Sequence, residues 1–217
     1  MKYQALIFDL DGTLLDTLDD LADGVNAALR AYNHPEKTRD EVCAAVGNGM
    51  LNLMDRVIPG GKTASDFDQI FAYFKQYYAA HCEDKTAPYV GIPEQLLKWR
   101  DAGVKMAIVS NKADFAVKKL AATYFPDTIT VAIGENEAAG IRKKPAPDTV
   151  DLALKELGVS RAEAVYIGDS EVDVETARNA DMPCLSVTWG FRTRDTLIAA
   201  GATTLVDTPQ QLYDATV

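Results

Sequence analysis

The sequence has few cysteines and few histidines. The three cysteines, Cys43, Cys82 and Cys184, form no CxxC pair. An odd number of cysteines without metal-ligand spacing indicates free thiols in a reducing compartment. The two histidines, His34 and His81, have no second His or Cys at metal-ligand spacing, so we expect no zinc site built on them.

The chain also lacks a long hydrophobic run. No apolar stretch is long enough to span a bilayer. The N-terminal segment MKYQALIFDLDG contains only a short apolar run, which Asp9 interrupts. Such a run is too short and too acidic for a signal peptide. We therefore expect a cytoplasmic protein with no membrane partner.

The chain also has no excess of positive charge. The formal net charge is -10, and a surface of that sign repels nucleic-acid backbones and anionic lipids. Nucleic acid is therefore not an expected partner. A phosphorylated substrate would be repelled too, so a site for it needs local positive charge or a metal ion. The 217 residues, 47% of them hydrophobic, are enough for one domain or two small ones.

The hydrophobic pattern changes along the chain. Residues 17–87 show helical periodicity, whereas the rest alternates short apolar runs with helical segments. The expected strands are residues 4–8, 104–109, 129–133, 164–167, 184–188 and 203–206. Strands that alternate with helices predict a doubly wound, Rossmann-like parallel sheet of the α/β class. We expect an α/β core of residues 1–16 and 88–217, interrupted by a helical insert of residues 17–87.

A pair of acids follows the first expected strand. Asp9 and Asp11 are two residues apart, and Gly12 permits a tight turn after them. Two carboxylates this close repel each other unless a cation lies between them or one keeps its proton. Phosphoryl transfer needs such a pair, because one carboxylate can attack phosphorus while the other moves protons.

Polar residues follow three later strands. Ser110-Asn111-Lys112 offers a hydroxyl and backbone N–H groups at an expected helix start. Lys144-Pro145 offers a fixed positive charge. Asp169 and Asp173, in the segment GDSEVD, are acids where a strand gives way to a helix. Asp169 could join Asp9 as a magnesium ligand, and Asp173 could orient Lys144 or support the metal site.

Each of these sites alone has an ordinary structural explanation, such as a helix cap or a solvated loop. Together they are much harder to explain in that way, because ligands of parallel sheets bind at the carboxyl ends of the strands. Their sum supplies a nucleophile, an acid/base, metal ligands and groups that hold phosphate. Phosphoryl transfer needs little else beyond positioning and charge neutralisation.

In these four motifs the sequence resembles the haloacid dehalogenase superfamily. The matches are DLDGT at 9–13, Ser110, Lys144-Pro145 and GDSEVD at 168–173. The helical insert resembles the cap of the subgroup that contains the phosphoglycolate phosphatases. The segments VGNG at 46–49 and TWGF at 188–191 are similar to that subgroup as well.

The resemblance implies a Mg2+-dependent phosphatase with roles for individual residues. Asp9 would be the nucleophile and Asp11 the general acid/base, while Lys144 would neutralise the phosphoryl oxygens. The remaining implied roles are substrate binding by Thr13, Ser110, Asn111, Gly47 and Asn48, metal binding by Asp9, Asp169 and the backbone carbonyl of Asp11, and support by Asp173.

Two residues look unusual beside the family pattern. Asp181 stands where relatives commonly have Gly, and Asp tolerates a left-handed backbone better than most residues. Glu171 adds a negative charge near the expected metal site, which could raise metal affinity or simply face solvent.

The expected activity is hydrolysis of a small phosphorylated metabolite through an aspartyl phosphate, with phosphoglycolate as the leading candidate. A phosphomutase or pyrophosphatase of the same fold is an alternative. A receiver domain that keeps its phosphoryl group without turnover is an alternative of another class. The sequence does not decide between a monomer and a homodimer.

Overall fold

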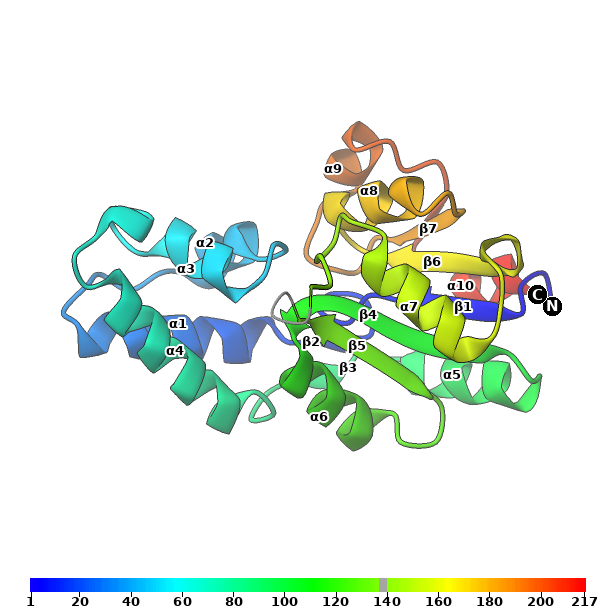
Figure 1. Ribbon diagram of the computed structural model, residues 1–217, viewed down its shortest axis with the longest axis horizontal. Coiled ribbons are helices and arrows are strands. Elements are labelled where there is room, and N and C mark those ends of the chain that lie inside the picture. The colour runs from blue at the N-terminus through cyan, green and yellow to red at the C-terminus, as the bar shows by residue number, and fades with distance from the viewer. Residues whose placement is uncertain (137–139) are drawn as a thin grey trace. The chain divides into compact units, whose positions relative to one another are not determined.

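The computed structural model describes residues 1–136 and 140–217 of the chain (Figure 1). The chain divides into two compact units, which we call the core unit and the helical unit. The core unit comprises residues 1–15 and 88–217, and the helical unit comprises residues 16–87. That the helical unit acts as a cap stays a prediction.

The core unit is built on a six-stranded sheet in the order β5-β4-β1-β6-β7-β8. All the paired strands run parallel. The strands are β1 (Ala5–Phe8), β4 (Lys105–Ala113), β5 (Val131–Glu135), β6 (Ala164–Gly168), β7 (Cys184–Val187) and β8 (Leu205–Val206). The expected doubly wound α/β fold is confirmed.

Helices cover both faces of this sheet, which explains why its central strand is apolar throughout. Leu6 and Phe8 of β1 face one layer of the core, whereas Ala5 and Ile7 face the other. All four side chains are fully buried. One layer is covered by α5 (Ile92–Asp101), α6 (Asp114–Tyr124) and α10 (Pro209–Thr216), and the other by α7 (Asp148–Leu157) and α8 (Glu171–Asn179).

The strand order reverses direction beside β1. From β1 the chain adds β4 and β5 on one side and then returns to place β6 on the other. In open parallel sheets, ligands bind beyond the carboxyl ends of the strands at such a reversal. The carboxyl ends of β1 and β6 carry Asp9 and Asp169, so the topology brings these two acids together.

One strand is longer than the sequence predicts. β4 continues to Ala113, and its pairing with β5 shifts register between Val109 and Ala113. Ser110, Asn111 and Lys112 therefore lie within an irregular strand end. The expectation that they follow the strand at a helix start was wrong, because the ladder resumes at Ala113 before α6 begins at Asp114.

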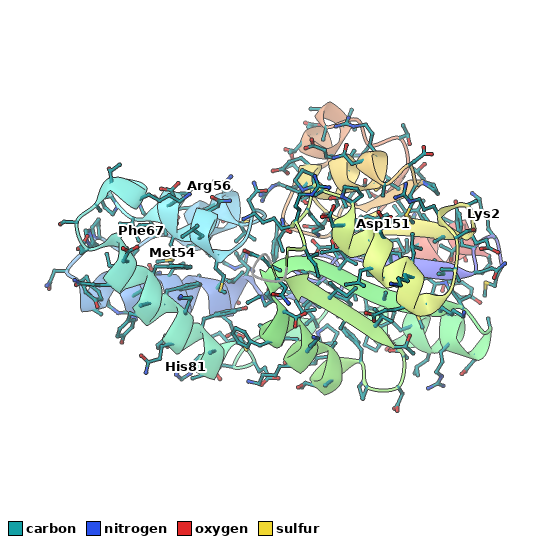
Figure 2. All side chains as sticks on the ribbon, viewed as in Figure 1. Lys2, Met54, Arg56, Phe67, His81 and Asp151 are labelled. Atoms are coloured by element: carbon teal, nitrogen blue, oxygen red, sulfur yellow. The ribbon has the colours of Figure 1, made fainter. Side chains whose placement is uncertain are left out.

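The helical unit packs its helices around aromatic and aliphatic side chains. Its helices are α1 (Leu18–Ala31), α2 (Arg39–Ala45), α3 (Met50–Val57) and α4 (Phe67–His81), with a 3-10 turn at Gly61–Thr63. Met54 and Phe67 are buried, whereas Arg56 of the same unit is exposed (Figure 2). Phe74 and Tyr78 stack within α4 with ring centroids 5.7 Å apart. The helical spacing of these aromatics therefore reflects core packing, as expected.

Short elements complete the chain. They are β2 (Leu15–Asp16) and β3 (Ala87–Pro88), which pair in a two-stranded sheet, the 3-10 turn Arg161–Glu163, and α9 (Arg194–Ala199). No disulfide joins Cys43, Cys82 and Cys184. Among the described residues, no helix has both the length and the apolar character that crossing a membrane requires. The cytoplasmic location stays a prediction.

Candidate active site

A tight turn after β1 presents the first acid. Asp9 is 8% exposed, and the backbone N–H of Leu10 donates to its Oδ1 at 2.7 Å. The turn then closes through backbone hydrogen bonds from Leu14 and Leu15 to the carbonyl of Leu10. Gly12 has φ 86°, a conformation that glycine adopts readily. The DLDGT segment thus folds back on itself directly at the end of the central strand.

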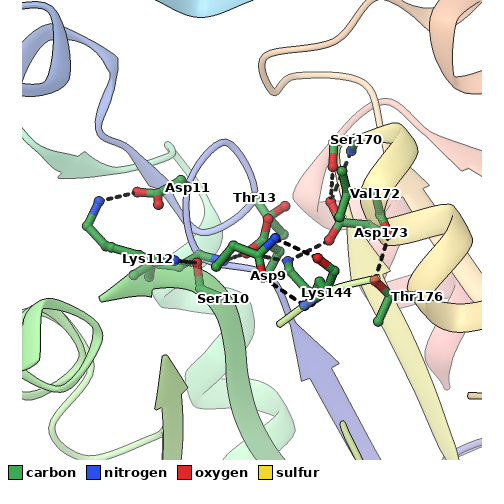
Figure 3. Close-up of polar contacts among 12 residues, drawn as sticks. Asp9, Asp11, Thr13, Ser110, Lys112, Lys144, Ser170, Val172, Asp173 and Thr176 are labelled. Atoms are coloured by element: carbon green, nitrogen blue, oxygen red, sulfur yellow. Dashed lines mark hydrogen bonds and ion pairs between the residues drawn. The ribbon is translucent and has the colours of Figure 1, made fainter. Parts of the chain in front are cut away.

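Lys144 lies between two acids, as Figure 3 shows. Its Nζ is 2.9 Å from Oδ1 of Asp9 and 2.8 Å from Oδ1 of Asp173. The side chain of Asn111 bonds both backbone groups of Lys144: its Nδ2 donates to the carbonyl at 3.0 Å and its Oδ1 accepts from the N–H at 2.8 Å. The Lys144-Pro145 peptide bond is cis. The ammonium group is therefore fixed beside the carboxylate of Asp9.

Asp173 is engaged at both of its carboxylate oxygens. Tyr166 donates its hydroxyl to Oδ1 at 3.0 Å, beside Lys144. Ser170 donates to Oδ2 from its N–H at 3.1 Å and from its hydroxyl at 2.6 Å, which caps the start of α8. Because these donors already occupy it, Asp173 is better suited to hold Lys144 than to bind a metal ion.

Asp169 is oriented by two donors from different parts of the chain. The hydroxyl of Thr13 donates to Oδ1 at 3.2 Å, and the backbone N–H of Phe191 donates to Oδ2 at 2.7 Å. Gly12 and Gly190 approach so closely that a Cβ on either would lie 2.3 Å from an atom of Asp169. The two glycines therefore leave this carboxylate the room that larger residues would fill.

The acids at this site are crowded. Asp9, Asp169 and Asp173 each offer an oxygen within 4.8 Å of the others, and all three are buried. Burial, together with the charge of Asp173, raises the pKa of Asp9 to about 7, although Lys144 opposes the shift. Burial, together with the charges of Asp173 and Asp9, also raises the pKa of Asp169.

The balance of charge in this cluster indicates whether the residues fit a metal ion. Burial alone would lower the pKa of Lys144, but the charges of Asp173 and Asp9 outweigh it and raise that pKa. The ammonium group of Lys144 thus pairs with Asp9 and Asp173 but not with Asp169, so the three acids outnumber the positive charge beside them. Oxygen ligands with excess negative charge are what a divalent cation such as Mg2+ prefers. The buried acidic cluster fits a metal site.

Asp11 contacts a lysine that the sequence patterns did not single out for a role. Nζ of Lys112 is 2.8 Å from Oδ1 of Asp11, and the lysine side chain is only 3% exposed (Figure 3). The N–H of Lys112 also donates to the hydroxyl of Ser110 at 3.3 Å. The irregular end of β4 therefore places Ser110 and Lys112 beside the turn of residues 9–13 (Figure 3).

Two predicted substrate-binding residues belong to the helical unit. Gly47 and Asn48 lie in the loop between α2 and α3, where the Asn48 carbonyl accepts from the side chain of Asn52 at 2.8 Å. Gly47 has φ 127°. Their contact with a substrate stays a prediction. So do the phosphoryl contacts of Ser110 and of Thr13, whose hydroxyl here bonds Asp169.

Several residues that shape the site were not predicted from the sequence. They are the side chain of Asn111, Lys112, Tyr166, Ser170 and the backbone N–H of Phe191. A tyrosine hydroxyl inside an otherwise apolar strand could have indicated a buried polar partner for Tyr166. No local pattern could have indicated the N–H of Phe191, because it depends on how a distant loop returns to the sheet.

Comparison with known proteins places this fold and site in a family. The model of the haloacid dehalogenase-like hydrolases matches residues 6–187. A phosphoglycolate phosphatase of Thiobacillus denitrificans is 31% identical over 196 residues, covering 88% of this chain and 86% of that protein. The N-acetylmuramic acid 6-phosphate phosphatase of Pseudomonas aeruginosa is 29% identical, covering 99% of this chain and 95% of that protein.

A solved structure gives the same result. The crystal structure of a candidate phosphoglycolate phosphatase from Lactobacillus delbrueckii subsp. bulgaricus matches with a TM-score of 0.94 and 39% identity, covering 100% of this chain and 99% of that one. The chain belongs to the haloacid dehalogenase-like hydrolase family, and within it the chain is a phosphatase that resembles the phosphoglycolate phosphatases.

Proposed function

We propose that this phosphatase hydrolyses a small phosphomonoester through an aspartyl phosphate on Asp9, with phosphoglycolate as its leading substrate and Mg2+ as its cofactor. One observation carries the proposal. Asp9 lies at the carboxyl end of the central strand, 2.9 Å from the buried ammonium group of Lys144 and among further acids. The phosphatase relatives support hydrolysis as the outcome.

In the first half of the reaction, an oxygen of Asp9 attacks phosphorus. The ester P–O bond breaks, and the leaving oxygen takes a proton from the carboxyl group of Asp11. Lys144 holds positive charge beside Asp9, where the phosphoryl oxygens would gather, and Asp173 fixes that lysine at 2.8 Å. This half of the reaction leaves the phosphoryl group on Asp9.

In the second half, water attacks phosphorus and gives its proton to the carboxylate of Asp11. The bond between phosphorus and Asp9 breaks, which releases inorganic phosphate and restores both acids. Side chains of Asp9 and Asp169 and the backbone carbonyl of Asp11 would hold Mg2+. The ion, when bound, supplies charge neutralisation for the phosphoryl oxygens.

The relatives suggest a feature of the substrate. Phosphoglycolate and N-acetylmuramic acid 6-phosphate, the substrates named for the two enzymes above, differ in size, but both carry a carboxylate as well as a phosphoryl group. The second compound is therefore the second candidate substrate. As the predicted cap, the helical unit would choose between them and shield the reaction from bulk water.

The test measures inorganic phosphate release with Mg2+ from matched pairs of substrates. Phosphoglycolate is compared with ethyl phosphate, and N-acetylmuramic acid 6-phosphate with N-acetylglucosamine 6-phosphate, so that each pair differs by a carboxylate-bearing group. We expect a strong preference for phosphoglycolate in kcat/KM and no turnover by Asp9→Asn. Substantial activity of Asp9→Asn would refute the nucleophile, and phosphate transferred to a sugar would indicate a mutase.

A further inference from the structure

The loop of residues 189–192 contacts the site at several separate points. We call this loop the clasp. Nε1 of Trp189 donates to the carbonyl of Thr13 at 3.1 Å, and the N–H of Phe191 donates to Oδ2 of Asp169 at 2.7 Å. The clasp therefore bonds both the turn of residues 9–13 and Asp169, although these two segments are more than one hundred residues apart in the chain.

Gly190 shows how close this approach is. A Cβ at that position would lie 2.3 Å from Cβ of Asp169 and 2.4 Å from the carbonyl oxygen of Gly12. Real Cβ atoms do not come so near other atoms, so a side chain here would push the clasp away from both segments. Gly190 does not have a left-handed backbone, and its small size is what the position needs.

An ion pair fastens the far end of the clasp. Nε of Arg192 donates to Oε2 of Glu171 at 2.9 Å, and the arginine side chain is only 11% exposed. Glu171 is the first residue of α8 and lies two residues after Asp169. The ion pair thus connects the clasp to the segment that carries Asp169. Glu171 therefore does not merely face solvent, which was one of the two expectations for it.

We propose that the Glu171–Arg192 pair positions Asp169 through the clasp and so sets the affinity of the site for its divalent cation. This inference rests on the proposed function, in which Asp169 binds Mg2+. Neither residue takes part in the chemistry. Arg192 acts through the N–H of Phe191, next to it in the chain, which must stay in place to orient the carboxylate of Asp169.

A purely electrostatic role for these charges predicts the opposite result. If charge near the site controlled cation affinity, removing the positive charge of Arg192 would strengthen Mg2+ binding. If the clasp controls it, the same removal weakens binding, because Asp169 loses its fixed orientation. The direction of change in Arg192→Gln therefore separates the two explanations.

The experiment measures the thermal unfolding midpoint at increasing Mg2+ concentrations. This yields a Kd for Mg2+ without any measurement of turnover. We expect Arg192→Gln and Glu171→Gln each to raise the Kd about ten-fold, and the double variant to do no more than either, since both remove one interaction. Arg192→Lys keeps the charge and should recover part of the loss. At saturating Mg2+, kcat should stay within about two-fold of the wild type.

Arg194→Gln is the matched control. Arg194 is two residues away and pairs with Asp207 at 2.7 Å, but both side chains are about half exposed and neither bonds Asp169. Its Mg2+ Kd should not change. A Kd in Arg192→Gln that is unchanged or lower overturns the clasp, even if the wild type hydrolyses phosphomonoesters with Mg2+. A wild type that neither binds Mg2+ nor needs it overturns the proposed cofactor, and the inference with it.

Discussion

Two regions of the molecule bury acids in different ways. In the helical unit, Asp20 of α1 is 2% exposed and accepts hydrogen bonds from the N–H groups of Lys85 and Thr86 and from the Thr86 hydroxyl, at 2.7–3.1 Å. In the core unit, Asp9 and Asp169 are also buried but lie among other acids.

The difference teaches what a buried carboxylate is for. A carboxylate that receives several hydrogen bonds and has no other buried acid beside it fastens one segment to another, as Asp20 fastens the end of the helical unit to α1. Carboxylates that repel one another weaken the fold unless something else binds there. The first arrangement is structural, and the second is prepared for a ligand.

The largest expected effect is on turnover. Asp173→Asn removes the charge that fixes Lys144 at 2.8 Å, and we expect kcat to fall about 100-fold. The equally buried Asp20→Asn should leave the kcat of the folded enzyme unchanged, because Asp20 belongs to the structural arrangement. Steady-state kinetics at saturating substrate compare the two variants. A similar loss of kcat in both variants would contradict the distinction between a structural acid in the helical unit and functional acids in the core unit.

For the free energy of unfolding we expect the opposite: substitution of Asp20 should cost stability, and substitution of Asp9 should not. Asp20→Ala removes the acceptor of the Lys85 N–H and of the buried N–H and hydroxyl of Thr86, so we expect a loss of about 2–3 kcal/mol in the free energy of unfolding. Asp9→Asn relieves repulsion and should raise stability in the absence of metal. Urea unfolding with a chelator present measures both. A loss of stability in Asp9→Asn would mean that the crowded acids hold the fold together.

The stability of the metal-free protein should also depend on pH, because Asp9 titrates differently in the folded and unfolded states. Its pKa is raised from 3.8 to about 7, so between these pH values the folded protein holds a proton that the unfolded chain releases. The metal-free protein should therefore lose stability as pH rises through this window. Asp9→Asn should flatten that part of the profile, and added Mg2+ should restore stability near pH 8. Thermal unfolding between pH 5 and 8 tests this, and identical profiles for both proteins would contradict it.

Much of the fold could be predicted because strand and helix periodicities differ. Apolar runs such as residues 164–167 gave the central strands, and Asp181 does adopt the left-handed backbone anticipated for it, with φ 53°. The short strands β2 and β3 were missed because neither lies in an apolar run: β2 ends in Asp16 and β3 in Pro88. The end of β4 at Ala113 was missed because its polar residues, Ser110 to Lys112, interrupt the apolar pattern.

The site divides along a similar line. The sequence predicted that Asp9, Asp169 and Lys144 lie together, because each follows an expected strand of the same parallel sheet. The groups that orient them could not be predicted, since Asn111 and Phe191 act through contacts with residues 33 and 22 positions away. Such contacts depend on tertiary packing, and no spacing in the sequence encodes them.

The smallest expected effect concerns Lys112, whose ammonium group is 2.8 Å from Asp11. Lys112→Met should misplace the acid that protonates the leaving oxygen, and we expect kcat to fall about ten-fold with an alkyl phosphate. With p-nitrophenyl phosphate the fall should be under about two-fold, because that leaving group needs little help from an acid. Lys118→Met, which removes an exposed lysine paired with Asp114 at 2.6 Å, is the matched control. Equal losses with both substrates would mean that Lys112 supports the fold rather than Asp11.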